Sequence, residues 1–266
     1  LNNVGDLTYP YSFLNGNIQD IKNIVEEKHE ITDIIKQSKK PLIILGQSAM
    51  TSKFGKYIFE SIKRFLIKND KINNEWNALN IISEHASSVG SFDLGIYNLN
   101  ERENSVLSNL KNNNYELIFL LGQDSLEFKK NNEFIIYQGS HGDKGAEISD
   151  IILPGAAYTE QDGYYTNLEG KLQKAYKASY PPGDAKEDWQ IINDLSEAIS
   201  GKKLFNNKDN LESSLLNYLK LFKDKNLQKL NKDTTEEAFI NGKIEINNID
   251  YYYSNVIARA SKTMFE

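Results

Sequence analysis

The segment Gly46-Gln47-Ser48-Ala49 follows an apolar run and precedes a predicted helix, which is where an α/β hydrolase places its nucleophilic serine. The hydrolase motif G-x-S-x-G requires a second glycine, and Met50 stands in its place. No spacing ties His85 or His141 to Ser48 as a base. The sequence therefore favours an ordinary turn and helix cap at Ser48, with a serine hydrolase as the weaker alternative.

A glycine-rich segment, Gly139-Ser140-His141-Gly142-Asp143-Lys144-Gly145, also follows a predicted strand. Its glycines could let backbone N–H groups approach an anion. A phosphate loop needs a helix next and a G-K-[ST] ending, whereas this one leads within a few residues to the apolar run 151–153. We expect the glycines to permit a tight crossing, with Asp143 and His141 satisfying backbone groups. A small-ligand site at Gly139, His141, Gly142 and Asp143 is the weaker alternative.

The remaining candidates for chemistry are histidines and carboxylates. His29, His85 and His141 show no short metal-ligand spacing, so no metal site is expected. Spacing alone does not bring the carboxylates of the region 147–162 to a catalytic separation, and we expect them on a solvated face. No catalytic residue is predicted on this chain.

Composition excludes several classes of function. The 266 residues contain no cysteine, which leaves no disulfide, no thiolate nucleophile and no cysteine ligand for an iron–sulfur cluster. A formal net charge of -6 provides no field that attracts nucleic acid. The longest apolar runs, such as 41–45 and 116–121, are far shorter than the roughly 20 residues that span a bilayer. No secretory signal pattern is visible.

Short apolar runs alternate with helical patterns along the chain. Continuously apolar runs of this length are typical of strands buried on both faces of a sheet. We therefore predict an α/β fold with an open, mostly parallel sheet flanked by helices. The expected elements are helices over 18–37, 52–69, 187–200 and 211–230, strands over 41–46, 79–82, 115–121, 134–137 and 151–153, and an extended or hairpin segment over 158–180.

The domain organisation is predicted to be simple. Residues 1–201 are expected to form one α/β domain, and residues 202–266 a peripheral, helical or irregular C-terminal extension. The extension contains Tyr251, Tyr252 and Tyr253, large side chains that bury well between chains. An interface with a partner and packing of the tail on its own domain are equally good interpretations of these tyrosines.

Several motifs together resemble one family. They are 138–143 (QGSHGD), 149–160 (SDIILPGAAYTE), 165–173 (YTNLEGKLQ), 181–189 (PPGDAKEDW) and 258–264 (ARASKTM). In this order they resemble the carboxy-terminal domain of the large iron–sulfur subunit of respiratory complex I (NADH:ubiquinone oxidoreductase), called the 75 kDa subunit in mitochondria. The resemblance covers nearly the whole chain.

The resemblance implies a fold derived from molybdopterin oxidoreductases. In those enzymes this region helps to wrap a pterin cofactor, whereas in the complex I subunit the cofactor is generally absent and the domain is a scaffold. The cysteine-rich cluster modules of the full-length subunit are not in this chain, so cluster binding is not carried over. Ser140 stands where the family usually has a second histidine beside His141, which weakens the case for a histidine pair.

The function implied by the resemblance is a non-catalytic structural subunit, or split half-subunit, of the peripheral arm of mitochondrial-type complex I. The expected partners are other complex I subunits, above all the cluster-bearing N-terminal half of the same subunit, with no cofactor on this chain itself. The expected location is the matrix side of the mitochondrial inner membrane, or alternatively the cytoplasmic face of a bacterial plasma membrane. A fragment of a catalytic molybdopterin-dependent oxidoreductase is the alternative function.

Overall fold

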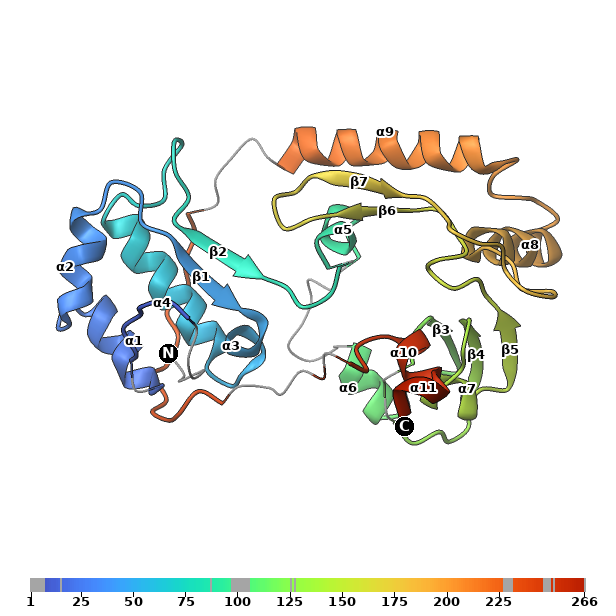
Figure 1. Ribbon diagram of the computed structural model, residues 1–266, viewed down its shortest axis with the longest axis horizontal. Helices are drawn as coiled ribbons and strands as arrows, with labels where there is room; N and C mark the ends of the chain where they lie inside the picture. Colours follow the sequence, from blue (N-terminus) through green and yellow to red (C-terminus); the bar gives the residue numbers. More distant parts are fainter. Residues whose placement is uncertain are drawn as a thin grey trace. The chain divides into compact units, whose positions relative to one another are not determined.

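The computed structural model describes residues 8–14, 16–86, 88–96, 106–124, 126, 128–226, 232–245, 250 and 252–265. The chain divides into two compact units, each of which is described by itself (Figure 1). Unit 1 comprises Leu1–Ser88 and Asp224–Asn248, and unit 2 comprises Val89–Lys223 and Ile249–Glu266. These units do not follow the boundary after residue 201 that the sequence suggested, and that division of the chain stays a prediction.

Unit 1 is built from helices on one face of a short parallel sheet. Its buried core contains Ile18 and Ile21 of the first helix, Ile58, Ile62 and Leu66 of the longest one, and Leu45 and Leu79 of the two strands. The elements are α1 (Ile18–Val25), α2 (Glu30–Gln37), β1 (Ile43–Gly46), α3 (Gln47–Thr51), α4 (Gly55–Lys68) and β2 (Leu79–Ile82).

The single helix expected over 18–37 is two helices. Glu27 has a positive φ of 63°, and the backbone N–H of Lys28 donates to the Asn23 carbonyl, which ends α1. His29 then starts α2, because its Nδ1 accepts the backbone N–H of Ile31 at 3.1 Å. Periodicity does not reveal the break, since the apolar spacing continues across it.

One face of the β1–β2 sheet is apolar and exposed. The two strands are parallel, with Ile44 paired with Asn80 and Gly46 with Ile82. Leu42, Ile44 and Ile82 are exposed on this face, whereas Leu45 and Leu79 are buried against the helices. The expectation of strands buried on both faces is therefore wrong for β1 and β2 among the described residues.

Unit 2 contains a three-stranded parallel sheet and an antiparallel hairpin. The parallel sheet has the order β3-β4-β5, and the hairpin pairs β6 with β7. The elements are α5 (Ser88–Asp93), α6 (Val106–Lys111), β3 (Leu117–Leu121), β4 (Phe134–Gly139), α7 (Lys144–Glu147), β5 (Ile151–Pro154), β6 (Gly163–Thr166), β7 (Leu172–Ala175), α8 (Asp188–Ser200), α9 (Lys208–Asn226), α10 (Val256–Ala260) and α11 (Lys262–Phe265).

The helix that follows the hairpin begins and ends as its sequence predicts. Glu187 and Gln190 form a capping box at the start of α8, and Gly201 ends it with a φ of 71°. The Glu212 carboxylate of α9 accepts two hydrogen bonds from the hairpin. One comes from Lys174 Nζ of β7 at 2.7 Å, and the other from the Tyr164 hydroxyl of β6 at 3.1 Å. These bonds hold α9 along the hairpin, as Figure 1 shows.

The α/β class with parallel strands and flanking helices is confirmed. The strands are distributed among separate sheets, which a strand pattern alone does not specify, because pairing depends on contacts distant in sequence. None of the helices in the described ranges combines the length and apolarity that crossing a bilayer requires.

Candidate functional site

The glycine-rich loop lies at the carboxyl end of β4. The strand ends at Gly139, and α7 begins at Lys144, whose backbone N–H is accepted by the Asp143 carboxylate at 3.0 Å. The expectation that no helix follows the loop is therefore wrong. This helix has a single turn, so its peptide dipoles sum to little and its amino end attracts an anion only weakly.

Two glycines of the loop region are explained by packing around Tyr137. A Cβ on Gly139 would overlap the Tyr137 hydroxyl, and one on Gly145 would overlap the Gln123 carbonyl oxygen. Tyr137 is fully buried and donates its hydroxyl hydrogen to Asp124. Burial, together with that hydrogen bond, raises the pKa of Tyr137 far above its usual range. The tight crossing needs these glycines whether or not a ligand binds.

Asp143 is the strained residue of the loop. Its φ of 151° lies in a region that favours glycine, a conformation that costs about 1–3 kcal/mol. The Arg259 Nε of α10 donates to Asp143 Oδ2 at 2.9 Å. The same guanidinium donates through Nη1 to the Tyr253 carbonyl at 3.3 Å. Arg259 therefore fixes the C-terminal segment 252–265 to the loop.

A cavity of about 550 Å³ lies where this C-terminal segment meets the loop. Loop residues 141–143 line it on one side, and Tyr253, Val256, Arg259 and Ala260 on the other. His141 is exposed, and its Nδ1 lies 2.9 Å from Ser140 Oγ, so it bonds to a side chain and not, as expected, to the backbone. The prediction that the loop has a structural role stays a prediction, with a ligand site at Gly139, His141, Gly142 and Asp143 as the weaker alternative.

Replacing Arg259 with alanine is expected to free the C-terminal segment from the loop. An ion pair whose side chains are about one-third exposed contributes up to about 1 kcal/mol, so chymotryptic cleavage within 252–265 should become roughly fivefold faster. The measurement is a time course of limited proteolysis followed by mass spectrometry. Lys262→Ala, an exposed charge on the same segment, is the control. Equal cleavage rates for all three proteins would show that the contact does not hold the segment.

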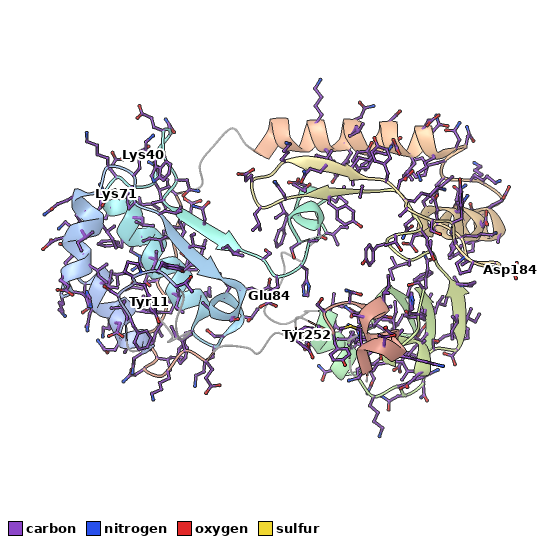
Figure 2. The ribbon with its side chains drawn as sticks, viewed as in Figure 1. Tyr11, Lys40, Lys71, Glu84, Asp184 and Tyr252 are labelled. Carbon is purple, nitrogen blue, oxygen red and sulfur yellow. The ribbon has the colours of Figure 1, made fainter. Side chains whose placement is uncertain are left out.

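The three tyrosines predicted as interface candidates, Tyr251, Tyr252 and Tyr253, have different surroundings in the structure. Tyr251 lies outside the described residues. Tyr252 is exposed (Figure 2), whereas Tyr253 donates its hydroxyl hydrogen to the Met264 carbonyl and lines the cavity. Tyr253 therefore packs within its own chain, and a partner interface at these tyrosines stays a prediction.

Ser48 lies inside α3 and does not cap it. The cap position is Gly46, which has no side chain to accept a backbone N–H, so the expected serine cap is wrong. The cavity beside Ser48, of about 320 Å³, is lined by Lys53, Lys243 and Glu245 together with small polar residues and Phe54. No histidine is among these described lining residues, so the geometry offers Ser48 no base from that cavity.

The other histidines have structural places or are exposed. His29 caps α2, and His85 is exposed after β2. Within the described part of the chain, no group of three or more histidine and carboxylate side chains is arranged to hold a metal ion. The expectation that this chain binds no metal stays a prediction.

A buried ion cluster around Glu187 was not predicted from the sequence. The Glu187 carboxylate, at the start of α8, accepts Lys208 Nζ at 2.7 Å, Trp189 Nε1 at 3.0 Å and Lys177 Nζ at 3.2 Å. Asp162 shares Lys208 at 2.9 Å. Burial disfavours the charged form of Glu187, but hydrogen bonds from Lys208, Trp189 and Lys177 outweigh it and hold its pKa below the usual range. The cluster joins the hairpin region, α8 and α9.

Replacing Lys208 with methionine is expected to reduce the free energy of unfolding of unit 2 by about 1–3 kcal/mol at pH 7, because Glu187 loses its closest charged partner. The folded pKa of Glu187 lies below its ordinary value of 4.5, so the cluster stabilises the fold above that pH and the stabilisation is lost as pH falls through the folded pKa. Urea unfolding at pH 7 and near pH 4 measures both effects.

The control for this change is Lys203→Met, which removes an ion pair to Glu197 in which both side chains are about half exposed. Such a pair contributes little, so the variant should unfold within about 0.5 kcal/mol of the parent. A Lys208→Met variant as stable as Lys203→Met at pH 7, or a difference that does not shrink near pH 4, would contradict the assignment.

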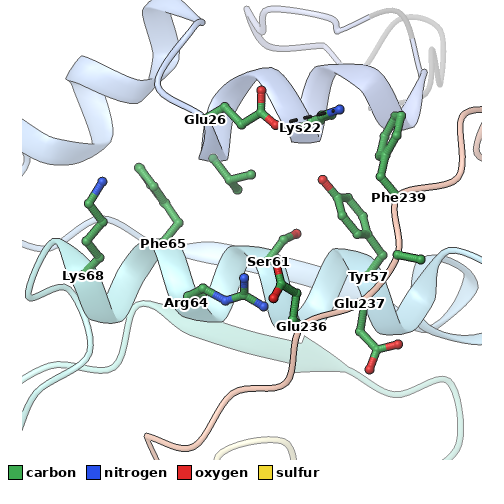
Figure 3. Close-up of a pocket in the computed structure, with 12 residues that line it drawn as sticks. Lys22, Glu26, Tyr57, Ser61, Arg64, Phe65, Lys68, Glu236, Glu237 and Phe239 are labelled. Carbon is green, nitrogen blue, oxygen red and sulfur yellow. Dashed lines mark ion pairs between the residues drawn. The ribbon is translucent and has the colours of Figure 1, made fainter.

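A larger cavity, of about 630 Å³, lies in unit 1 between α1, α4 and the segment 236–239 (Figure 3). Figure 3 shows Tyr57 and Phe239 side by side at one end, with ring centroids 5.4 Å apart. Arg64 donates to the Thr235 carbonyl at 2.6 Å, and Lys63 donates to the Asp233 carbonyl at 2.6 Å. Arg64 and the Tyr57–Phe239 pair of the lining, with the neighbouring Lys63, hold the segment around 233–239 against α4, so we assign this cavity a structural role.

Comparison with known proteins decides the family. The sequence profile described as molybdopterin oxidoreductase matches residues 1–198. The chain belongs to the molybdopterin oxidoreductase family. It is 36% identical over 268 residues to the NADH-ubiquinone oxidoreductase 75 kDa subunit of Reclinomonas americana, covering 97% of this chain and 38% of that protein. The resemblance drawn from the sequence motifs is thereby confirmed.

Bacterial relatives show the same coverage. A subunit of the NADH-quinone oxidoreductase of Rickettsia bellii is 35% identical over 261 residues, and its counterpart in Rickettsia conorii is 36% identical over 264 residues. Each match covers 97% of this chain but 37% of the relative. The chain thus spans less than two fifths of the length of these curated relatives.

The glycine-rich loop is a poor fit for the pterin cofactor that the molybdopterin oxidoreductase family implies. At the loop, Asp143 places a carboxylate where an anionic cofactor needs donors, and Arg259 already pairs with it. The glycines of the loop region that lie against Tyr137 are needed for close packing there. The chain also has no cysteine that could serve as a metal ligand. We therefore derive no chemical step through this cofactor.

Proposed function

We propose that this chain is a non-catalytic structural subunit, or half-subunit, of the peripheral arm of mitochondrial-type complex I. The observation that carries the proposal is the 36% identity to a 75 kDa subunit across 97% of this chain. The matched region includes both units of the chain. This coverage supports a role shared by the whole chain with the 75 kDa subunit, beyond a shared fold. The poor fit of the loop to a pterin cofactor supports a scaffold and not a catalyst.

The proposal assigns electron transfer to a partner. Iron–sulfur clusters in such subunits need cysteine ligands, and this chain has none. The clusters are then carried outside these 266 residues, by the part that corresponds to the cluster-bearing N-terminal half of the subunit. This chain braces that partner and other complex I subunits while electrons pass from NADH toward quinone. The assembly lies on the matrix side of the inner mitochondrial membrane.

Native gel separation of mitochondrial membranes, followed by mass spectrometry of each band, tests this proposal. Peptides of this chain should comigrate with complex I subunits and with in-gel NADH dehydrogenase activity. Treatment with a mild chaotrope that detaches the peripheral arm should move this chain together with the other arm subunits. Migration only as a free monomer of about 30 kDa would contradict the proposal.

A further inference from the structure

The β3–β4–β5 sheet presents one face without a cover among the described residues of unit 2. Paired residues of parallel strands point to the same face, so the register defines which side chains share it. We call the apolar residues of this face the open apolar face. They are Leu117, Phe119, Leu121, Phe134, Ile136, Ile151 and Leu153.

Exposure differs sharply between the two faces of this sheet. On the open apolar face, Leu117 is 59% exposed, Leu121 57% and Ile151 44%. The opposite face carries Ile135 and Tyr137, which are buried and packed against residues of α7 and the loop before β4. The sequence of these strands, apolar at successive positions, is suited to burial on both sides. Only the side of Ile135 and Tyr137 is packed, and on that side Ile152 of the edge strand β5 is also exposed.

The start of α8 covers the open apolar face only at the carboxyl end of β4. Gln138, which pairs with Leu121 and Leu153, is buried, and its Nε2 donates to Asp188 Oδ1 at the start of α8 at 2.8 Å. The cover provided by α8 stops at this carboxyl end. The exposed residues lie at the amino ends of the strands (Leu117, Phe134 and Ile151) and at the carboxyl end of β3 (Leu121), whereas the central Phe119 and Ile136 are partly buried. What is uncovered is therefore a defined area of a sheet that is otherwise packed.

A parallel sheet with an exposed apolar face is unusual, because helices normally cover both faces. Contiguous apolar patches on a folded domain mark interaction sites.

The dimensions of the face limit what can bind to it: three strands about 4.8 Å apart and about five residues long cover roughly 14 by 17 Å. That is roughly 240 Å², far less than the ~800 Å² per partner of a stable complex. The face fits one helix of about three turns from a partner that is also held elsewhere.

We propose that the open apolar face is where the remainder of the large subunit docks, through a helix with an apolar stripe. This inference rests on the proposed function. The relatives have more than half of their length outside the region that matches this chain, which is enough chain for such a helix and for further anchoring contacts. A second copy of this chain, by contrast, would bury too little area here to form a dimer.

Because the chain has no cysteine, single-cysteine variants report on this face with little disturbance. Leu121→Cys places a thiol on the open apolar face. Ile152→Cys is the matched control, since Ile152 lies on β5, is 56% exposed and points to the opposite face. In the isolated chain both thiols should react with a maleimide at similar rates. In complex with the cluster-bearing partner, the thiol at position 121 should react at least tenfold more slowly and the one at position 152 at an unchanged rate.

Charge substitutions provide the second measurement. Ile151→Glu and Ile152→Glu, on neighbouring positions of one strand, are co-expressed with the cluster-bearing partner and purified through a tag on this chain. Ile151→Glu should retain less than one tenth of the partner, and Ile152→Glu a wild-type amount. Circular dichroism and thermal melting of each isolated variant establish that it is folded, so loss of partner is not loss of fold.

Equal protection of positions 121 and 152, or wild-type retention of partner by a folded Ile151→Glu variant, would overturn the inference while leaving the proposed function intact. Self-association of the isolated chain that Ile151→Glu abolishes would also overturn it in favour of a second copy. Failure of the unmodified chain to associate with complex I subunits would instead refute the proposed function, and the inference with it.

Discussion

Truncation of Leu66 to alanine is expected to lower the free energy of unfolding of unit 1 by about 2–5 kcal/mol. Leu66 is fully buried in α4, in the cluster that joins α1, α4 and both strands of the β1–β2 sheet. The change removes apolar contacts and leaves a cavity that the surrounding helices fill only in part. An effect of this size is a large fraction of the stability of a domain.

Because the chain has two compact units, a readout confined to unit 1 is needed, and hydrogen exchange measured by mass spectrometry on peptides of α4 provides it. Ile34→Ala serves as the control, because Ile34 is an exposed residue of α2 in the same unit. Its exchange should stay close to that of the parent. Equal protection of α4 in Leu66→Ala and Ile34→Ala would show that the cluster around Leu66 is not the core of unit 1.

Replacing Gly55 with alanine should destabilise unit 1 by about 3 kcal/mol, the upper part of the range for overpacking. Gly55 is buried at the first position of α4, and a Cβ there would overlap the Met50 backbone carbonyl at the end of α3. Backbone atoms cannot move aside as a side chain can, so α3 and α4 must separate. Thermal melting together with hydrogen exchange in 47–68 measures the change.

Gly46→Ala is the matched control for this variant. Gly46 lies at the end of β1 with an extended backbone, and a Cβ there would meet no atom within 4 Å. Alanine at this position should leave the melting temperature within about 2 °C of the parent, as expected for a substitution that touches nothing. A Gly55→Ala variant as stable as Gly46→Ala would contradict the close approach of α3 and α4.

Local patterns predicted most of the elements of this fold. The strands at 43–46, 79–82, 117–121, 134–139 and 151–154 and the helix ended by Gly201 follow from apolar runs and from capping residues. The division of the strands among separate sheets could not be predicted, since strand pairing depends on contacts distant in sequence. The break at Glu27 was missed because a positive φ at a glutamate has no sequence signal.

The candidate site was located from sequence, but its contacts were not. The glycines mark the loop between β4 and α7, whereas the pairing of Asp143 with Arg259 joins residues more than a hundred positions apart. The cluster likewise brings together Asp162, Glu187 and Lys208 from three separate segments. Charged residues are common on exposed surfaces, so nothing in the sequence distinguishes those that become buried partners.

Metal analysis of this chain before and after its separation from its partner tests the central claim most directly. The assembly purified through a tag on this chain should contain iron and oxidise NADH. The chain released from it by mild denaturant and refolded alone should contain neither iron nor molybdenum in stoichiometric amount, and the iron should remain with the cluster-bearing partner. A redox centre retained on the isolated chain and bound by its own side chains would contradict the account.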